Sequence, residues 1–201
     1  VWWDLIKLMK RLLRREMGFR QSVRALELNT KIALTATGIL IFGGAVLILA
    51  LEHRNPGTLG NMPFWEKCMA ALFQSVTCRT AGFFTIPQEN LHEASAMICM
   101  ILMFIGGSPL GTAGGVKTTT VAALLLTGSS FFKGKEDTEV FNRRIPETNI
   151  RTAWVVVMLG LGVVLTSTVA LAIVTEGMAE GAYLINILYE VTSAGATVGL
   201  T

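Results

Sequence analysis

Long uncharged apolar runs, separated by short polar and basic stretches, dominate the pattern of this chain. Two of them are long and unbroken: 32–51, with 20 residues, and 152–175, with 24 residues. At about 1.5 Å per residue, a helix of either length spans roughly the 30 Å hydrocarbon core of a bilayer. We therefore predict that both runs are transmembrane helices.

Three further apolar regions are too short or too broken to form straight spanning helices. Segments 68–78 and 182–194 have the length of re-entrant half-helices, which enter a membrane and turn back. Region 94–132 is interrupted by GGSPLGTAGGVK at 106–117, so it predicts a helix, a glycine-rich break and a second helix. The predicted fold class is an all-α membrane protein built from tandem helix–pore-loop–helix repeats.

The two predicted half-helices and the segments after them are similar in sequence. FQSVTCRTAGF at 73–83 aligns with YEVTSAGATVGL at 189–200 if the second copy contains one inserted residue. Each copy runs into a Thr-x-Gly string. Internal duplication of this kind is typical of membrane transport proteins.

Composition and charge exclude several other classes. The chain is 52% hydrophobic and 15% charged, whereas a soluble domain carries about 25% charged residues. Residues 1–31 and 133–151 hold 13 of the 17 Lys and Arg residues, which places both stretches on the cytoplasmic side. Clustered bases also suit nucleic acid, but the apolar runs between the clusters favour a membrane flank, so we expect no nucleic-acid partner.

No residue pattern suggests covalent chemistry. The three cysteines (Cys68, Cys78 and Cys99) have no C-x-x-C spacing, and both histidines stand at the edges of predicted loops. We therefore predict that the chain is not an enzyme and that it holds no cofactor and no resident metal.

The two Thr-x-Gly strings are the candidate ion-binding site. Its residues are Thr80, Ala81, Gly82, Phe83, Thr197, Val198, Gly199 and Leu200. The second string resembles the T-V-G-Y-G filter of potassium channels, where backbone carbonyls replace the water of the ion without a fixed charge. Glycine permits the backbone angles that this requires, and the C-terminal end of a preceding half-helix is electrically negative. The strings therefore predict a site for a monovalent cation, K+ first.

The glycine-rich break is a candidate gate below the filter. Its residues are Gly106, Gly107, Ser108, Gly111, Thr112, Gly114, Gly115 and Lys117. The alternative is a membrane-anchored nucleotide-binding protein that uses 106–118, but Val116 separates Gly115 from Lys117 and breaks the G-x-x-x-x-G-K-[ST] pattern. Lys117 is either a barrier to cations or an anchor toward the cytoplasm.

Arg79 stands next to the first string and has two interpretations. It either repels cations at the mouth of the pore or pairs with Glu190 or another carboxylate to brace the loop. We favour bracing, because an unpaired charge inside a membrane is costly.

Taken together, four motifs resemble one family. They are NPGTLG at 55–60, FQSVTCRTAGFFT at 73–85, MFIGGSPLGTAGGVKTTT at 103–120 and TSAGATVGLT at 192–201. The chain resembles the Trk/Ktr/HKT superfamily of potassium transporters, and most closely the bacterial Ktr-type membrane subunit. Departures from the family pattern fall at Cys78, Phe84, Leu110 and Ala113.

The resemblance implies four tandem repeats around one pseudo-fourfold pore, of which this chain would be an internal piece. Residues 1–30 would then end the preceding repeat, 31–132 would form the third repeat, 133–151 a cytoplasmic linker, and 152–201 the fourth repeat up to its filter. The first two filter loops would lie outside the chain, so a sodium-selective or non-selective transporter of the same fold stays open.

The resemblance also implies partners and a location. The protein would be a homodimer in the cell (plasma or inner) membrane, with several passes and contact with membrane lipid. A cytosolic nucleotide-binding ring would control the gate, so that nucleotide binds only to that regulatory partner.

Overall fold

The computed structural model describes residues 27–108, 113–134, 139–140, 143–144, 146–175 and 183–200, together with Trp3 and Ile6. Its helices are α3 (Leu28–Glu52), α4 (Phe64–Thr77), α5 (Glu93–Phe104), α6 (Thr118–Phe132), α7 (Glu147–Thr175) and α8 (Leu184–Gly195), with a 3-10 turn, η1, at Gln88–Asn90. The predicted all-α class is confirmed. The predicted cytoplasmic linker adds two short antiparallel strands, β1 (Glu139–Val140) and β2 (Arg143–Arg144).

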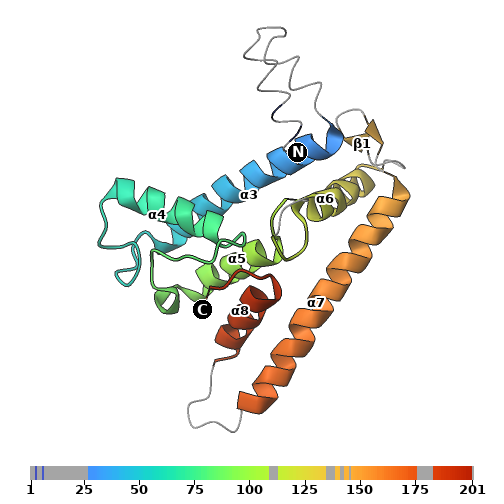
Figure 1. Cartoon of the computed structure of the whole chain (residues 1–201). Coiled ribbons are helices and arrows are strands. Elements are labelled where there is room, and N and C mark those ends of the chain that lie inside the picture. Colours follow the sequence, from blue (N-terminus) through green and yellow to red (C-terminus); the bar gives the residue numbers. More distant parts are fainter. Residues whose placement is uncertain are drawn as a thin grey trace, which may run out of the picture.

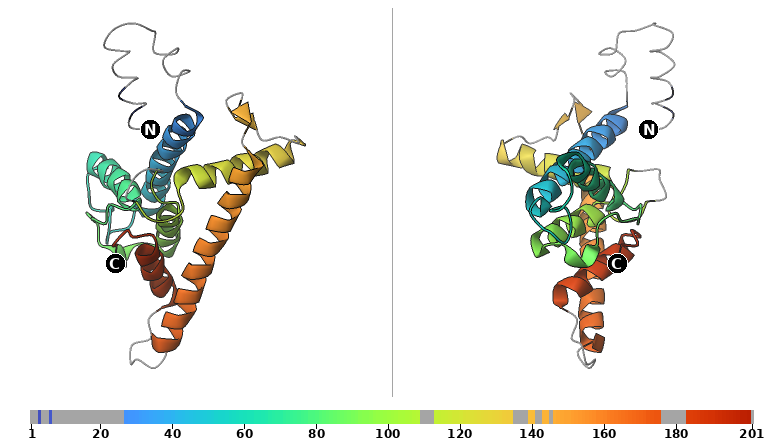
Figure 2. Two further views of the ribbon diagram at one scale, coloured as in Figure 1. Left: turned by 45° about the vertical axis from the view of Figure 1, so that its right-hand side comes forward. Right: turned by 90° about the vertical axis from the view of Figure 1, so that its left-hand side faces the viewer.

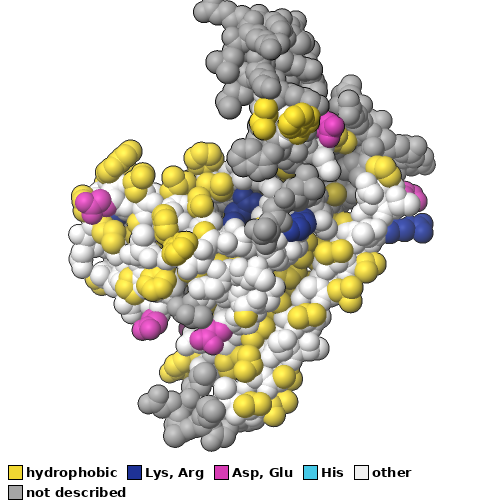
Figure 3. All heavy atoms as spheres, viewed as in Figure 1, with side chains coloured by type: hydrophobic (Ala, Val, Ile, Leu, Met, Phe, Trp, Pro, Cys, Tyr) yellow, Lys and Arg dark blue, Asp and Glu magenta, His cyan; other side chains and the backbone are white. Residues whose placement is uncertain are grey.

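Helices α3 and α7 are the predicted membrane spans. Each is long and apolar enough to cross a bilayer, with a mean hydropathy of 2.4 in its most apolar window. Only 22% of that window is buried in α3 and 6% in α7, so most of each helix presents apolar side chains to its surroundings. Figure 3 shows these side chains gathered along the whole length of α7. An apolar surface of this kind suits lipid.

The two predicted half-helices are α4 and α8, with 14 and 12 residues. Helix α4 starts one turn earlier than expected. Pro63 is its N-cap, and Phe64 to Lys67 form its first turn. The prolines and glycines of 52–67 predict an exposed loop, with Trp65 as an anchor at the membrane interface. The exposed loop was wrong in part, because Glu52 and Leu59 are fully buried, whereas Trp65 is 73% exposed.

The predicted break between α5 and α6 is also present. Ile105, directly after α5, pairs with Val116 in a parallel bridge. The chain therefore returns to the end of α5 before α6 begins. The Val116 amide donates to the Phe104 carbonyl at 2.9 Å, and the Thr118 amide donates to the Gly107 carbonyl at 3.2 Å. We call these paired residues, 104–107 and 116–118, the neck.

The helices pack around the ends of the half-helices. Helix α3 packs against α4, α5 and α6, and α8 lies between α5 and α7 (Figures 1 and 2). The close approach of α3 depends on Gly44, since a Cβ there would lie 2.5 Å from Ser75 Oγ and 2.8 Å from Leu102 Cδ1. The core includes residues of both Thr-x-Gly regions, among them Cys78, Ala196, Val198 and Leu200.

Candidate functional site

The two Thr-x-Gly strings, 116 residues or more apart in sequence, come together in the fold. Each directly follows the C-terminal end of a half-helix, α4 for the first and α8 for the second. Gly82 lies against the carbonyl oxygen of Val198, and a Cβ on Gly82 would be 3.8 Å from the Gly199 Cα. The sequence predicted both strings, and the structure adds that they are in contact.

The strings share one backbone conformation. Thr80 and Thr197 have positive φ angles of 73° and 55°, and Gly82 and Gly199 have φ angles of 75° and 84°. Among the described residues these two threonines are the non-glycine residues with positive φ. A left-handed conformation costs about 1–2 kcal/mol in a residue with a side chain. Two such residues at matched positions are therefore typical of a functional site, where the surrounding structure maintains a strained backbone conformation.

A side-chain hydroxyl holds each string to its half-helix. Thr77 Oγ1 accepts the Phe83 amide at 3.0 Å and also donates to the Phe83 carbonyl. In the second copy, Ser193 Oγ accepts the Leu200 amide at 2.8 Å. The bonds from the Phe83 and Leu200 amides join residues that are six and seven positions apart. This difference matches the one-residue insertion expected from the alignment. We call these two bonds the hydroxyl straps.

The glycine-rich segment meets the second string. Gly114 lies against Thr197 Oγ1, and a Cβ on Gly114 would be 2.5 Å from the Ala196 carbonyl oxygen. Gly106 lies against the Gly114 carbonyl, and Gly115 has a φ angle of 68°. The structure thus brings these predicted gate residues next to the second Thr-x-Gly string.

The other described gate residues contact α3 or the segment itself. Gly107 would have a Cβ 2.5 Å from the Ala113 Cβ, and Ser108 Oγ lies 3.3 Å from Thr37 Oγ1 of α3. Lys117 Nζ donates to the Ala113 carbonyl at 2.6 Å, so its charge rests on the backbone of the segment itself. Gly111 and Thr112, with Leu110, lie outside the described residues.

Arg79 braces the structure, but not through a carboxylate. Its Nη2 donates to the Thr118 Oγ1 at 2.7 Å and to the Gly106 carbonyl at 3.2 Å. Glu190, the expected partner, is exposed. The expectation of a carboxylate partner was wrong because the neck offers neutral oxygens at the place that the guanidinium reaches.

Sequence reasoning missed a polar link between the two half-helices. Gln74 of α4 is fully buried and its Nε2 donates to Gln88 Oε1 at 2.7 Å. The Tyr189 hydroxyl of α8 donates to the same Gln88 oxygen at 2.8 Å. A lone glutamine inside the apolar run of α4 was the available signal for this link.

Glu52 was also missed. This fully buried carboxylate at the end of α3 accepts hydrogen bonds from Asn55 Nδ2 at 2.7 Å, Thr58 Oγ1 at 2.6 Å and the His92 amide at 3.0 Å. His92 is the N-cap of α5, so the carboxylate ties the end of α3 to the beginning of α5. The acid three positions before the NPGTLG motif was the signal.

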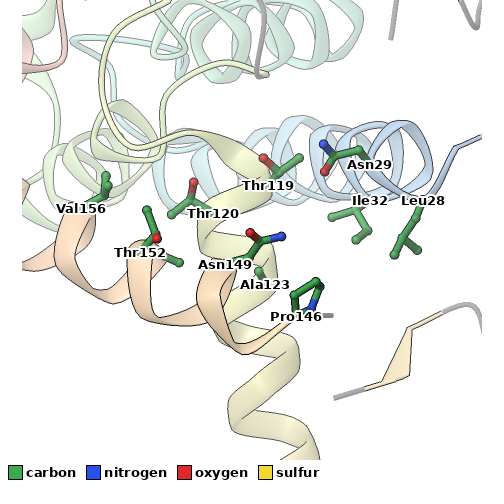
Figure 4. Close-up of a pocket in the computed structure, with 11 residues that line it drawn as sticks. Leu28, Asn29, Ile32, Thr119, Thr120, Ala123, Pro146, Asn149, Thr152 and Val156 are labelled. Atoms are coloured by element: carbon green, nitrogen blue, oxygen red, sulfur yellow. The ribbon is translucent and has the colours of Figure 1, made fainter. Parts of the chain in front are cut away.

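A polar cavity of about 290 Å³ lies between the N-terminal turns of α3, α6 and α7 (Figure 4). Its polar lining consists of Asn29, Thr119, Thr120, Asn149 and Thr152. The basic residues of 1–31 and 133–151 predict that this end of the helices faces the cytoplasm. The sequence did not predict this cavity.

The carbonyl and hydroxyl oxygens of the two strings are the candidate ligands for a cation. Within the part of the chain that the structure describes, no three His, Cys, Asp or Glu residues gather in a group that could hold a metal ion. Carbonyl and hydroxyl oxygens that follow the negative ends of two short helices suit a monovalent cation in transit.

Comparison with known proteins decides the family. A family model described as a cation transport protein, TrkH, matches residues 3–201. The chain belongs to the Trk/Ktr superfamily. The Trk/Ktr resemblance drawn from the motifs is thereby confirmed, and with it the membrane character of the chain.

Individual Trk/Ktr relatives agree. The chain is 38% identical over 179 residues to the potassium/sodium uptake protein NtpJ of Enterococcus hirae, covering 89% of this chain and 39% of that protein. It is 36% identical over 178 residues to the Ktr system potassium uptake protein B of Bacillus subtilis, with 89% and 39% covered. The Vibrio alginolyticus protein of the same name is 32% identical over 183 residues, with 91% and 39% covered. The chain therefore spans about two fifths of the length of these relatives.

Proposed function

We propose that this chain contributes to a potassium uptake pathway in which 80–83 and 197–200 are two segments of a backbone-carbonyl selectivity filter. The observation that carries the proposal is the shared backbone conformation of the two strings, with positive φ at Thr80, Gly82, Thr197 and Gly199. Alternating handedness of this kind turns successive carbonyls to the same side of the backbone. The names of the relatives, which include potassium uptake, support K+ as the ion.

The glycine-rich segment 106–117 is proposed as the gate of this pathway. It meets the second string at Gly114 and Thr197, and a bulkier residue at Gly114 would press on the filter backbone. A gate in this position changes flux without any covalent step, so no enzymatic activity is required.

The complete subunit is proposed to contain four such repeats, of which 31–132 and 152–201 are the third and fourth. Residues 1–30 and 133–151 would lie at the cytoplasmic face. We further propose a homodimer in the plasma or inner membrane, regulated by a cytosolic nucleotide-binding ring. The relatives named as Ktr system proteins support a partner subunit of this kind.

A second candidate is uptake of sodium together with potassium. The Enterococcus hirae relative is named a potassium/sodium uptake protein, and it is 38% identical to this chain. The nucleotide-binding alternative at 106–118 has less support. A phosphate-binding loop follows a strand, whereas this segment follows helix α5 and its Lys117 amine donates to the Ala113 carbonyl.

The experiment that tests the proposal is rubidium uptake by vesicles that contain the complete subunit, with Na+ or K+ as competitor. We expect uptake that K+ suppresses more strongly than Na+, and a loss of this preference in Gly199→Ser. The matched control is Gly128→Ser in α6, where nothing lies within 4 Å of an added Cβ. The filter assignment would be contradicted if both variants lost the preference for K+ equally, or if neither lost it. Equal suppression of uptake by K+ and Na+ would favour the sodium candidate.

A further inference from the structure

The neck of the glycine-rich segment is tied to the first string by a single side chain. Arg79 directly precedes Thr80, and its Nη2 donates to the Gly106 carbonyl and to the Thr118 hydroxyl. Gly106 and Thr118 lie on the outgoing and returning strands of the neck. One nitrogen of Arg79 therefore contacts both ends of the segment at the same time.

The three groups form a closed hydrogen-bonded triangle. Besides accepting from Arg79, the Thr118 hydroxyl donates to the Gly106 carbonyl at 3.0 Å. Thr118 is 1% exposed and Gly106 is buried. Water therefore has little access to replace these bonds, and hydrogen bonds to a charged donor are about twice as strong as neutral ones.

The charge of Arg79 strengthens this connection. Among the described residues its hydrogen-bond partners are the two neutral oxygens of the neck, and its Nε is buried without a partner. A guanidinium that leaves these oxygens would lose its two acceptors in a low-dielectric site, at a high cost in free energy. The arrangement therefore holds the guanidinium at the neck.

We infer that Arg79 and Thr118 form a latch that makes the neck of the gate and the first filter string one mechanical unit. Arg79 is a positioning residue in this role, because it acts on the filter through Thr80 and on the gate through Gly106 and Thr118. Loss of the latch loosens both elements together. Lys117 differs, since its amine contacts only the Ala113 carbonyl within the segment and its removal affects the gate alone. This inference rests on the proposed function.

The first test measures amide hydrogen exchange of the complete subunit in detergent. The Val116 and Thr118 amides, which bond to the Phe104 and Gly107 carbonyls, report on the neck whether or not any ion passes. We expect Arg79→Met and Thr118→Val to raise exchange in peptides covering the neck by about tenfold, the effect of one charge-assisted hydrogen bond. Thr118→Ser keeps the hydroxyl and the protection, and Arg79→Met combined with Thr118→Val raises exchange by less than the product of the two single effects, because the two side chains also bond to each other.

The second test measures rubidium uptake by the same variants, with Na+ competition and without the regulatory partner. We expect Arg79→Met and Thr118→Val to raise unregulated flux and to lower K+ over Na+ preference together, whereas Lys117→Met raises flux and leaves the preference unchanged. Arg151→Met is the matched control, because that arginine lies exposed on α7 with an ion pair to Glu147 at 3.6 Å.

The two tests separate the possible failures. Exchange that is unchanged in a folded Arg79→Met protein overturns the latch, whatever the flux. Additive effects in the double variant also overturn it, because they would show two independent contacts. If exchange rises in the variants but the wild-type subunit carries no rubidium, the latch is supported as structure and the proposed function is overturned instead.

Discussion

Gly82 lies directly against the carbonyl oxygen of Val198, so the two Thr-x-Gly strings are in contact through their backbones. The contact joins a glycine with positive φ in the first string to the middle residue of the second. No side chain fits between them, which explains why glycine stands at 82. Val198 is 5% exposed and Leu200 is fully buried, so this contact belongs to the core of the described structure.

The first prediction compares the two filter glycines. Gly82→Ala combines a positive φ with a clash against the Val198 carbonyl, whereas Gly199→Ala has the same strain but no atom within 4 Å of the new Cβ. We expect Gly199→Ala to cost about 1–2 kcal/mol, the cost of a left-handed alanine, and Gly82→Ala to cost more. Thermal unfolding in detergent measures both. Equal losses of stability would mean that the strings are not in contact.

The second prediction concerns the hydroxyl straps. Ser193→Ala leaves the Leu200 amide, in a fully buried residue, without its hydrogen-bond acceptor. We expect a loss of about 1–3 kcal/mol and a weaker preference for K+ over Na+. Thr77→Val has the same effect on the first string, and Thr77→Ser is the control that keeps the oxygen. Ion preference in uptake assays checks this, and a Thr77→Ser protein as impaired as Thr77→Val would refute the straps.

The sequence predicted elements better than it predicted contacts. Uncharged runs of membrane length gave α3 and α7, because hydropathy and helix rise set their length directly. The alignment of 73–83 with 189–200 gave the candidate site with its one-residue insertion, and the straps close loops that differ by this one residue. These features are local, so a linear pattern contains them.

The partners of Arg79 and Glu52 could not be predicted in this way. The acceptors of Arg79 come from residues 27 and 39 positions away, and Glu52 accepts from an amide 40 positions away. Which groups meet across such distances depends on how α5 ends and where the chain returns. A general rule that buried charges need partners was correct for both residues, but it does not choose between a carboxylate and a carbonyl.

The third prediction uses two adjacent glycines of α3. A Cβ at Gly44 would lie 2.5 Å from Ser75 Oγ and 2.8 Å from Leu102 Cδ1, whereas Gly43 has nothing within 4 Å. Ser75 Oγ donates to the Ile41 carbonyl at 2.8 Å, so its displacement also breaks this bond. We expect Gly44→Ala to lower stability by about 1–3 kcal/mol and Gly43→Ala to leave it nearly unchanged. Thermal unfolding decides, and equal stability of the two variants would contradict the packing of α3 on α4.

The fourth prediction concerns the carboxylate that joins α3 to α5. In Glu52→Gln one of the two oxygens becomes an NH2 group, which faces a donor: the His92 amide at one position, or Asn55 and Thr58 at the other. We expect a loss of about 1–3 kcal/mol, because a buried donor is left unpaired. Glu66→Gln in the first turn of α4 is the control. Unfolding of Glu52→Gln at the wild-type temperature would show that the carboxylate charge is not needed there.

The fifth prediction concerns the chain by itself. A dehydrated monovalent cation needs about six to eight oxygens around it, and this chain supplies two strings that touch along one side. The chain covers 39% of the length of its relatives. We therefore expect that the 201-residue chain passes no K+ in liposomes. The control is the complete subunit in the same lipid at equal protein content. Potassium flux through the 201-residue chain would require a filter assembled from several copies, and would overturn the four-repeat arrangement of one subunit.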